Sequence, residues 1–245
     1  MQCVILAGGL GTRMRPHTEQ VPKVLVPVAG KPFAFHQLDW LSRHGVDEVI
    51  FCIGYRGEQV MEAVGDGRPW GVRARYVEDG PQAAGTGGAL RRALDSGLLA
   101  DRFVVHYGDS YLPFDLRPFF AAFECRGLPA MMVVYRNSHR PGMNNVDFAD
   151  GRVLRYDKRP DRPPADFIDY GATALTREVV AERIPSTGFA DLADLTRRLS
   201  VEGLLAGYEA TERFHEIGSP EGLAELERWM ETARARSGVD ARRLA

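Results

Sequence analysis

Long hydrophobic runs are absent from this 245-residue sequence, in which no stretch approaches the roughly 20 apolar residues that a membrane-spanning helix needs. Cysteine is also scarce, and the three cysteines, Cys3, Cys52 and Cys125, are odd in number and far apart. They indicate neither a disulfide framework nor a zinc site, so we expect a reducing, cytoplasmic location. A strand rather than a signal peptide opens the chain, and export or membrane anchoring is not expected. The net charge of −2 argues against a general nucleic-acid binder.

Lysine is rare in this sequence. Only three of the 31 residues that are Lys or Arg are lysines, namely Lys23, Lys31 and Lys158, and the others are arginines. A compact ammonium on a flexible stem differs chemically from the planar fork of arginine, so each retained lysine invites a specific reason. We predict that Lys23 and Lys158 bind phosphate groups. For Lys31, a chance surface position explains the residue equally well.

Strand-like and helix-like segments alternate through the first half of the chain. The predicted strands are 3–7, 48–53, 72–77, 103–107 and 130–135, and the predicted helices are 32–44, 58–64, 88–96 and 116–126. This βαβ rhythm predicts an α/β fold around a parallel sheet. The rhythm then changes, because 146–148 and 152–157 flank Asp150-Gly151, a two-residue hairpin signal. A last helix, about 220–235, is predicted to pack through one stripe formed by Leu223, Leu226 and Met230.

A glycine-rich loop follows the first strand. It reads Gly8-Gly9-Leu10-Gly11-Thr12-Arg13, and Pro22-Lys23 follows at a distance. Closely spaced glycines let backbone N–H groups form an anion-binding concavity. The loop lacks the Gly-Lys-Ser/Thr end of the Walker pattern and the last glycine of the dinucleotide fingerprint. It therefore predicts another kind of nucleoside triphosphate site, with nucleotide contacts from Leu6, Ala7, Gly8, Gly9, Gly11 and Thr12.

The run Gly-Gly-x-Gly-Thr-Arg-x-Arg-Pro with its distant Pro-Lys resembles the signature of the sugar-1-phosphate nucleotidylyltransferases. The resemblance implies a Rossmann-like, three-layer α/β/α fold with a mostly parallel sheet, of the nucleotide-diphospho-sugar transferase type. It also implies an Mg²⁺-dependent enzyme that joins an NTP to a sugar 1-phosphate and releases pyrophosphate, with Arg13 and Lys23 as catalytic residues. Among the branches, the chain is most similar to heptose or hexose 1-phosphate guanylyltransferases that feed surface polysaccharide or glycoconjugate assembly. Uridylyl, thymidylyl and cytidylyl transfer remain open alternatives.

Two carboxylates are candidates to hold Mg²⁺. Asp109 follows the strand 103–107, and the carboxyl ends of parallel strands meet at one edge of a sheet, so it is expected near the glycine loop. A hard cation such as Mg²⁺ prefers carboxylate oxygens together with substrate phosphates. The resemblance supplies the second ligand from His215-Glu216-Ile217-Gly218-Ser219-Pro220, where Glu216 stands at the family's usual Asp. Ser219 and Pro220 also read as the start of a helix.

Three further segments resemble binding elements of the family. Thr86 and Gly87 lie in a glycine loop, and the resemblance implies that this loop contacts the base and the ribose. An apparent insertion at Pro81-Gln82-Ala83-Ala84 precedes the loop. A plain turn from strand to helix is the alternative interpretation of the loop. The segment around Lys158 resembles an element whose lysine meets the sugar phosphate. The segment at Asp169 and Gly171 resembles a sugar-contacting element, and we expect Asp169, Gly171 and Tyr107 to bind the sugar phosphate together with Lys158. A solvent-facing Asp169 is nearly as good an interpretation.

The expected reaction needs positioning more than acid–base chemistry. A phosphate oxygen of the sugar 1-phosphate attacks the α-phosphorus in line and pyrophosphate leaves, so catalysis must come from orienting and neutralising two anions. A non-catalytic homologue that senses nucleotides and a glycosyltransferase are the alternatives from other classes. Glu216 favours the former, and the absence of an Asp-x-Asp motif after the strand 103–107 disfavours the latter.

No repeat, low-complexity linker or run of like charge divides the sequence. We expect one domain over residues 1–245, with a nucleotide-binding portion at about 1–115, a sugar-phosphate-binding portion at about 116–236 and a tail at 237–245. The partners are NTP and a sugar 1-phosphate, with no nucleic acid and no membrane. The sequence is compatible with a monomer or a homo-oligomer.

Overall fold

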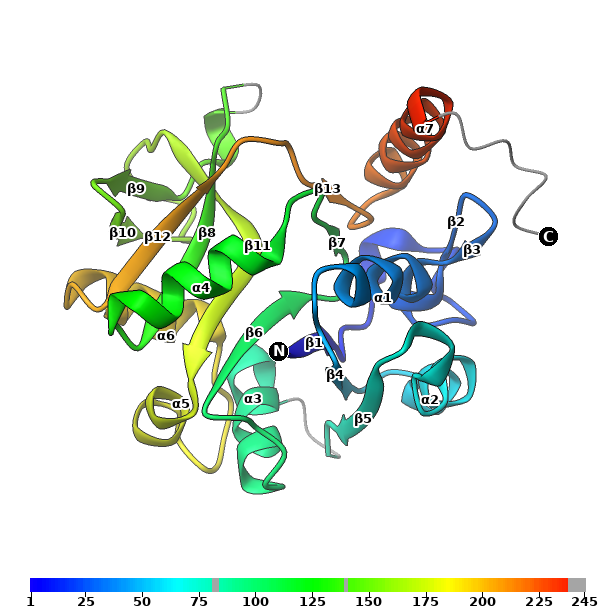
Figure 1. The fold of residues 1–245 in the computed structure, drawn as a ribbon, viewed down its shortest axis with the longest axis horizontal. Coiled ribbons are helices and arrows are strands. Elements are labelled where there is room, and N and C mark those ends of the chain that lie inside the picture. Colours follow the sequence, from blue (N-terminus) through cyan, green and yellow to red (C-terminus); the bar gives the residue numbers. More distant parts are fainter. Residues whose placement is uncertain (81–83, 139–140, 238–245) are drawn as a thin grey trace.

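The computed structural model describes residues 1–80, 84–138 and 141–237. Within these residues, nine strands form one sheet in the order β5-β4-β1-β6-β11-β8-β12-β10-β9. The chain up to about residue 115 occupies one side of the molecule, and most of the remainder occupies the other (Figure 1). No helix in the described part of the chain is long and apolar enough to cross a membrane.

The N-terminal part is a parallel α/β unit, as predicted. Its strands are β1 (Gln2–Ala7), β4 (Glu48–Ile53), β5 (Arg73–Glu78) and β6 (Arg102–Tyr107), and its helices are α1 (Phe33–Arg43), α2 (Gly57–Val64) and α3 (Gly85–Asp95). Successive strands pair in parallel and in register, with Gln2 opposite Glu48. Each confirmed element begins within three residues of its predicted start, because glycines and prolines mark the boundaries clearly.

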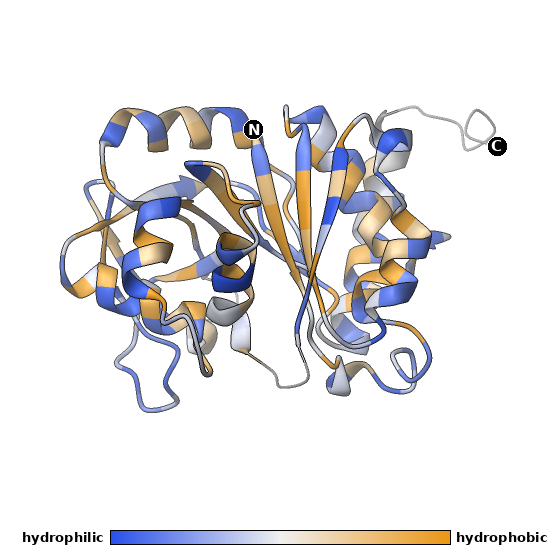
Figure 2. Cartoon of the chain, turned by 90° about the horizontal axis from the view of Figure 1, so that it is seen from below, coloured by the Kyte–Doolittle hydropathy of each residue, from blue (hydrophilic) through white to orange (hydrophobic). Residues whose placement is uncertain are grey.

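Apolar residues cover both faces of these strands, which makes three layers. Cys3 and Ile5 pack with α1, α2 and α4 (Leu116–Arg126) on one face. Val4 packs with α3, α5 (Arg177–Arg183) and α6 (Leu192–Val201) on the other face. Figure 2 shows the hydrophobic colouring concentrated along the strands and on the inward sides of the helices. Burial on both faces is why β1 and β4 read as nearly continuous apolar runs, whereas the edge strand β5 carries the exposed residues Arg73 and Glu78.

The expectation of a mostly parallel sheet is wrong for the second half. The strands there are β8 (Ala130–Arg136), β9 (Val146–Ala149), β10 (Arg152–Tyr156), β11 (Phe167–Thr176) and β12 (Leu205–Ala210). Strand β11 lies antiparallel to both β6 and β8, and the predicted hairpin joins β9 to β10. Strand β12 is parallel to β8, so the sheet is mixed. The reversal arises because β11 enters the sheet between β6 and β8 from the opposite end.

Several short elements lie outside the nine-stranded sheet. They are the ladders of β2 (Pro27–Val28) with β3 (Lys31–Pro32) and of β7 (Ser110–Tyr111) with β13 (His215–Glu216), and the 3-10 helices η1 (Thr12–Met14), η2 (Lys23–Leu25), η3 (Arg68–Trp70) and η4 (Pro141–Met143). Each places a loop segment beside the sheet without extending it.

The last helix, α7 (Pro220–Ser237), returns to the N-terminal part (Figure 1). Its predicted stripe of Leu223, Leu226 and Met230 is confirmed, because these residues pack in one cluster with Met14 and other buried side chains near the glycine loop. Ser219 starts the helix as expected, since its Oγ accepts a hydrogen bond from Gly222 N at 3.2 Å. The predicted tail beyond residue 237 and the apparent insertion at 81–83 lie outside the described residues.

Candidate active site

Two neighbouring cavities open at the carboxyl ends of the parallel strands. The first, which we call the glycine-loop cavity, lies beside the loop after β1. It is lined by Leu6, Ala7, Gly8, Gly9, Leu10, Lys23, Val24, Cys52, Asp79, Gly85, Thr86, Ala89, Tyr107, Gly108 and Asp109. Six of the predicted nucleotide-binding and catalytic residues are therefore brought together here, although they come from three separate stretches of the sequence.

The second cavity, which we call the charged cavity, shares Tyr107 and Asp109 with the first. It is lined by Arg13, Tyr107, Asp109, Gly142, Met143, Asn145, Lys158, Arg162, Ile168, Asp169, Gly171 and Glu216. All four residues predicted to bind the sugar phosphate lie on its wall, together with Arg13 and both predicted metal ligands. The shared residues make the two cavities adjoining parts of one site.

Lys23 and Asp109 form an ion pair at the junction of the cavities. Lys23 opens η2, and its Nζ lies 2.8 Å from Asp109 Oδ2, with both side chains partly accessible. Asp109 reaches this position because Gly108 passes close to the end of β1, where Gly108 N donates to Leu6 O. A Cβ on Gly108 would lie 2.7 Å from that oxygen, so only glycine fits there.

Glu216 is held next to Asp109 by the small ladder of β13 and β7. Glu216 pairs with Ser110, and Ile217 N donates to Asp109 O at 2.8 Å. Desolvation and the negative charges of Asp109 and Asp169 raise the pKa of Glu216 to about 7, although the residue remains accessible to solvent. Lys158 and Arg13 act in the opposite direction. A carboxyl group whose charge is disfavoured by a neighbouring carboxylate, as that of Glu216 is, is suited to share a divalent cation with it.

Mg²⁺ fits this donor set. The described residues contain no group of three or more His, Cys, Asp or Glu side chains arranged to hold a metal. Mg²⁺ commonly uses only one or two carboxylates and completes its octahedron with water and substrate phosphates. Asp109 and Glu216 therefore fit a cation that arrives with a phosphate ligand rather than one held in a closed protein cage.

Lys158 lies over aromatic rings in the charged cavity. Its Nζ is 5.0 Å from the centre of the Tyr107 ring and 5.5 Å from that of Tyr156, and it is 3.4 Å from Asp169 Oδ2. Burial opposes the charge, but Tyr107, Asp169 and Tyr156 outweigh it, so the pKa of Lys158 lies above its ordinary value. Burial likewise raises the pKa of Tyr107 to about 12. Lys158 is a cation held at a fixed position, which suits a phosphate ligand.

Asp169 is buried, so the solvent-facing interpretation of this residue is wrong. Tyr156 Oη donates to its Oδ2 at 3.2 Å, and Gly171 N donates to its Oδ1 at 3.0 Å. Gly171 has φ of +97°, and a Cβ there would lie 3.1 Å from Ser110 Oγ. The backbone conformation thus requires glycine and ties β11 to the segment that carries Asp109.

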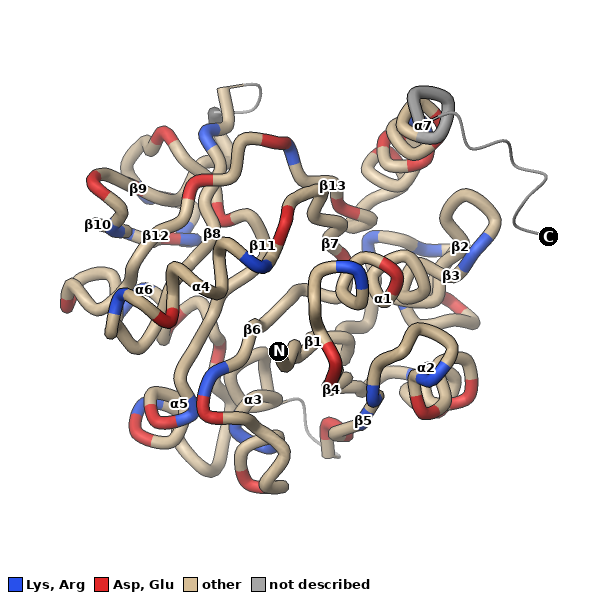
Figure 3. The backbone as a smooth tube through the Cα atoms, in the orientation of Figure 1, with Lys and Arg blue, Asp and Glu red and all other residues tan. Residues whose placement is uncertain are grey.

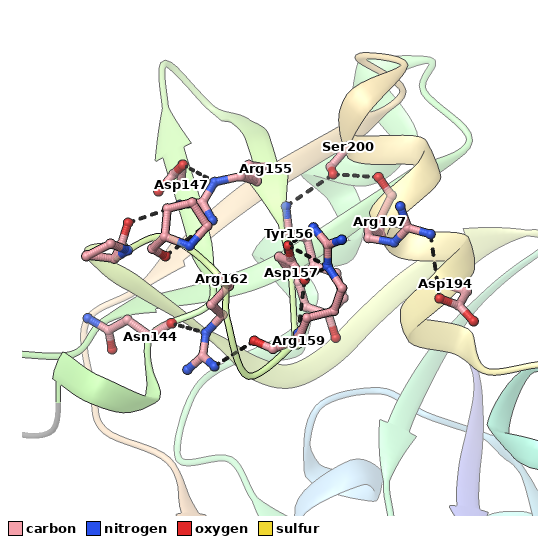
Figure 4. A network of polar contacts seen from close by, with 12 residues as sticks. Asn144, Asp147, Arg155, Tyr156, Asp157, Arg159, Arg162, Asp194, Arg197 and Ser200 are labelled. Carbon is pink, nitrogen blue, oxygen red and sulfur yellow. Dashed lines mark hydrogen bonds and ion pairs between the residues drawn. The ribbon is translucent and has the colours of Figure 1, made fainter.

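The segment carrying Lys158 is fixed by a network of polar contacts (Figure 4). Asp157 Oδ2 accepts from Arg159 Nη2 at 2.6 Å, and Tyr156 N donates to Ser200 Oγ at 3.1 Å. Arg162 Nε donates to Asn144 O at 2.8 Å, which joins the loop after β10 to the loop before β9. The lysine therefore projects from a braced strand end rather than from a free loop.

Arg13 reaches the charged cavity from η1 and forms no ion pair with a described residue. Its Nη2 lies 3.7 Å from the position that a Cβ on Gly218 would occupy, so the guanidinium sits beside the turn after β13. Gly11, one residue before η1, has φ of +62° and starts the turn that aims Arg13. Gly11 and Thr12 do not line the glycine-loop cavity, and their role in nucleotide contact stays a prediction.

Thr86 and Gly87 are engaged by the protein itself. Thr86 Oγ1 donates to Asp191 Oδ1 and accepts from Leu192 N, both at 2.8 Å. Gly87 N donates to Ala190 O at 2.8 Å, and a Cβ on Gly87 would lie 3.0 Å from that oxygen. Close packing of α3 against the loop before α6 therefore accounts for Gly87, while Thr86 still lines the glycine-loop cavity.

Asp79, which follows β5 and lines the glycine-loop cavity, is not among the residues predicted from the sequence. A carboxylate after a predicted strand, at the same sheet edge as Asp109, was the available signal. Arg162 and Asn145 on the charged cavity were also missed, because they come from loops whose course is set by tertiary contacts. Basic and acidic residues are interspersed along the chain in both parts of the molecule (Figure 3), so local placement rather than one extended charged segment distinguishes the site.

A phosphate ligand requires cations, and a divalent cation requires carboxylates; this site offers both beside a glycine loop. Such a site is typical of nucleotide-handling proteins. The sequence model of the family described as nucleotidyl transferase matches residues 2–232, so the chain belongs to that family. A solved structure described as a putative glucose-1-phosphate thymidylyltransferase from Bacillus anthracis superposes with a TM-score of 0.82 and 23% identity, covering 94% of each chain. This likeness confirms the α/β fold.

Three curated relatives illustrate the range of the family. A mannose-1-phosphate guanylyltransferase of Mycobacterium tuberculosis is 30% identical over 93% of this chain and 65% of its own length. An N-acetylmuramate alpha-1-phosphate uridylyltransferase of Neisseria meningitidis is 28% identical over 89% of this chain and 94% of its own. A D-glycero-alpha-D-manno-heptose 1-phosphate guanylyltransferase of Aneurinibacillus thermoaerophilus is 35% identical over 49% of this chain and 51% of its own. The chain spans about half to two thirds of the length of the first curated relatives that it matches.

Proposed function

We propose that this protein transfers a nucleotidyl group from an NTP to a sugar 1-phosphate, giving a nucleotide sugar and pyrophosphate. The single observation that carries the proposal is the charged cavity. It gathers two separated cations, Arg13 and Lys158, and two carboxylates, Asp109 and Glu216, directly beside the glycine-loop cavity. A reaction between two phosphate-bearing anions needs such an arrangement, because their mutual repulsion must be neutralised.

Each charged residue has a place in this reaction. Lys158 docks the phosphate of the sugar 1-phosphate, which is already nucleophilic and needs no strong base. Arg13 binds the leaving β- and γ-phosphates, for which its fork geometry is suited. Lys23 stabilises the α-phosphoryl group as the bond to the attacking oxygen forms and the bond to pyrophosphate breaks. Mg²⁺ held by Asp109 and Glu216 supplies further neutralisation of phosphate charge when bound.

The ion pair of Lys23 with Asp109 fits the same scheme. At 2.8 Å, each residue neutralises the other while the cavities hold no phosphate. An incoming triphosphate with its cation offers both residues a new partner of opposite charge, so the exchange leaves no charge unpaired. The pair thus keeps the junction ordered before substrate binds.

Our choice of nucleotide is GTP, and our choice of acceptor is a heptose or hexose 1-phosphate for surface polysaccharide or glycoconjugate precursors. The guanylyltransferases of Mycobacterium tuberculosis and Aneurinibacillus thermoaerophilus support this choice. The uridylyltransferase of Neisseria meningitidis, which the chain matches over 94% of its length, makes uridylyl transfer the second candidate. The presence of Arg13, Lys23, Asp109 and Lys158 around the cavities supports an enzyme over a non-catalytic homologue.

A matrix assay of pyrophosphate release tests the proposal. The four NTPs and dTTP are each combined with a panel of hexose and heptose 1-phosphates, with and without Mg²⁺. Release that requires GTP, one sugar 1-phosphate and Mg²⁺ is the expected result. Release with another NTP would correct the nucleotide alone, whereas no release across the panel despite measurable NTP binding would support the non-catalytic alternative.

A further inference from the structure

Arg162 lines the charged cavity but directs its guanidinium at main-chain oxygens. Its Nε donates to Asn144 O at 2.8 Å, its Nη2 to Gly142 O at 2.9 Å and its Nη1 to Arg159 O at 3.2 Å. The side chain is partly buried and forms no ion pair with a described residue. The rigid fork of an arginine presents its donors in fixed directions, so three carbonyl acceptors fix the positions of the chain segments that carry them.

These hydrogen bonds connect two loops (Figure 4). The segment 141–145, which begins with η4, precedes β9, and Arg162 itself lies in the loop between β10 and β11. Asn144 adds a bond in the other direction, because its Nδ2 donates to Ala165 O at 3.0 Å. Within the part of the chain that the structure describes, no main-chain hydrogen bond joins residues 141–144 to another element. The side chains of Arg162 and Asn144 therefore hold η4 in place.

The segment that Arg162 holds forms part of the acceptor side of the site. Gly142 and Met143 line the charged cavity together with Lys158, which we assign to the phosphate of the sugar 1-phosphate. Neither residue lines the glycine-loop cavity. Met143 is 49% exposed, so its apolar side chain is open to a ligand rather than packed in the core. A shift of η4 would therefore change the space beside the sugar and leave the nucleotide side unaltered.

We propose that Arg162 is a positioning residue for the acceptor substrate. It holds η4 at the spacing from Lys158 that the sugar of a sugar 1-phosphate fits, and it acts through Gly142 O and Asn144 O without touching the reacting phosphates. The inference rests on the proposed function for the identity of the acceptor. Loss of the guanidinium frees these carbonyl oxygens and lets η4 move, so the sugar is held less accurately while the nucleotide is bound as before.

Arg162→Met tests the proposal, because it keeps a long side chain and removes every donor. Pyrophosphate release by the full chain is measured while the sugar 1-phosphate and the NTP are varied in turn. The value of kcat/KM for the sugar 1-phosphate should fall by about 10- to 100-fold, as expected when a substrate is misplaced by about 1 Å. KM for the NTP should stay within about threefold of the wild-type value, since the glycine-loop cavity is unchanged.

Arg155→Met is the matched control. Arg155 also donates three hydrogen bonds in this region, from Nε to Asp147 Oδ2 at 2.6 Å and from its two terminal nitrogens to Pro163 O at 3.3 Å and Pro164 O at 3.0 Å. It does not line the charged cavity. The control should therefore keep the wild-type kcat/KM for the sugar 1-phosphate, even if its melting temperature falls as much as that of Arg162→Met.

Two further variants separate positioning from a general loss of stability. Lysine keeps the charge, but a single ammonium cannot span oxygens in three directions, so Arg162→Lys should retain most of the defect. In Arg162→Ala, guanidinium chloride below its denaturing range should restore part of kcat/KM for the sugar 1-phosphate, relative to wild type in the same solution. Sodium chloride at equal ionic strength should not. A variant that is merely destabilised would instead lose activity further in guanidinium.

Hydrogen exchange follows the held segment independently of turnover. The Asn145 amide donates to Phe167 O at 2.9 Å at the end of that segment, and it should exchange faster in Arg162→Met than in Arg155→Met. Equal exchange in the two variants would contradict the hold on η4.

Three kinetic results would overturn the role of Arg162. They are an unchanged kcat/KM for the sugar 1-phosphate in Arg162→Met, an equal loss for both substrates in that variant, and the same acceptor-specific loss in Arg155→Met. The proposed reaction is judged separately. A wild type that turns over no sugar 1-phosphate overturns the reaction, whereas a wild type that turns over normally beside an unimpaired Arg162→Met overturns only the positioning role.

Discussion

Protonation of a single buried histidine is expected to loosen the segment that presents Asp109. His106 lies on β6 and is fully buried, and Gly171 O accepts from its Nδ1 at 3.3 Å while its Nε2 accepts from Gln37 at 3.0 Å. The two N–H groups of Gln37 are shared among His106 Nε2, Tyr107 O and Ser110 O, and the last two acceptors lie on either side of Asp109. The hydrogen bond from Gln37 requires neutral imidazole, since a protonated Nε2 cannot accept, whereas the bond from Nδ1 to Gly171 O can persist in either state.

The size of the stability change follows from the difference between the pKa values of His106 in the unfolded and in the native protein. Burial lowers the pKa of His106 from 6.5 to about 4, with only partial opposition from its hydrogen bond to Gly171 and the charge of Asp109. Between pH 6.5 and about 4 the unfolded chain takes up a proton that the native protein refuses, so stability falls as the pH falls. At about 1.4 kcal/mol per pH unit, this interval corresponds to about 3 kcal/mol of the free energy of unfolding.

The assay compares urea unfolding of wild type and His106→Gln from pH 7.5 to pH 4. Carboxylates contribute equally to both proteins, so the difference between the two curves isolates His106. The variant should be less stable at pH 7.5, and the gap should narrow by about 3 kcal/mol at pH 4. His17→Gln, at an exposed histidine, controls for the loss of an imidazole. Parallel curves for wild type and His106→Gln would refute the reasoning.

Three further substitutions test the site. Lys23→Ala should lower turnover by about 100- to 1000-fold in the pyrophosphate-release assay, as expected for a lost electrostatic stabiliser, and near-wild-type turnover would exclude an essential role. Lys158→Ala should raise KM for the sugar 1-phosphate more than KM for the NTP. It should also lower the melting temperature, because Asp169 loses its cation. An unchanged KM for the sugar 1-phosphate would show that Lys158 does not bind the phosphate. Gly171→Ala should destabilise the protein by about 1–3 kcal/mol in urea unfolding, since φ is +97° and Ser110 stands in the way, whereas wild-type stability would show that the backbone relaxes there.

The parallel part of the fold could be predicted from the sequence because residues close to each strand and helix indicate where that element begins and ends. After the long first connection from β1 to α1, each strand and the helix that follows it lie within about 25 residues, and glycine or proline marks most boundaries. The direction of β11 could not be predicted in the same way. Nine of its ten residues are buried, Asp169 and Thr173 among them, so both faces of the strand are covered, but the sequence does not show which way the strand runs. That choice depends on β6 and β8, which lie far away in sequence.

The residues of the candidate site likewise fall into those that a short local motif predicts and those that only contacts between distant segments position. Asp109, Lys23 and Lys158 could be predicted because each lies in a short segment that resembles a family motif. The partners of Thr86 could not, because Asp191 and Leu192 lie more than 100 residues further along the chain. Asp79 was missed because Glu78-Asp79-Gly80 reads as an ordinary polar turn. Only the structure places this residue in the wall of the glycine-loop cavity.

The β7–β13 ladder has a consequence for how the chain acquires its site during synthesis. Asp109 and Glu216 are held side by side although 107 residues separate them. A nascent chain that ends before residue 215 contains the glycine loop, Lys23 and Asp109 but has no second carboxylate beside them. The proposed cation site therefore needs a contact between segments far apart in sequence, which can form only after Glu216 has been synthesised. Until then the chain carries the glycine loop and the cation that we assign to the nucleotide, but only one of the two carboxylates.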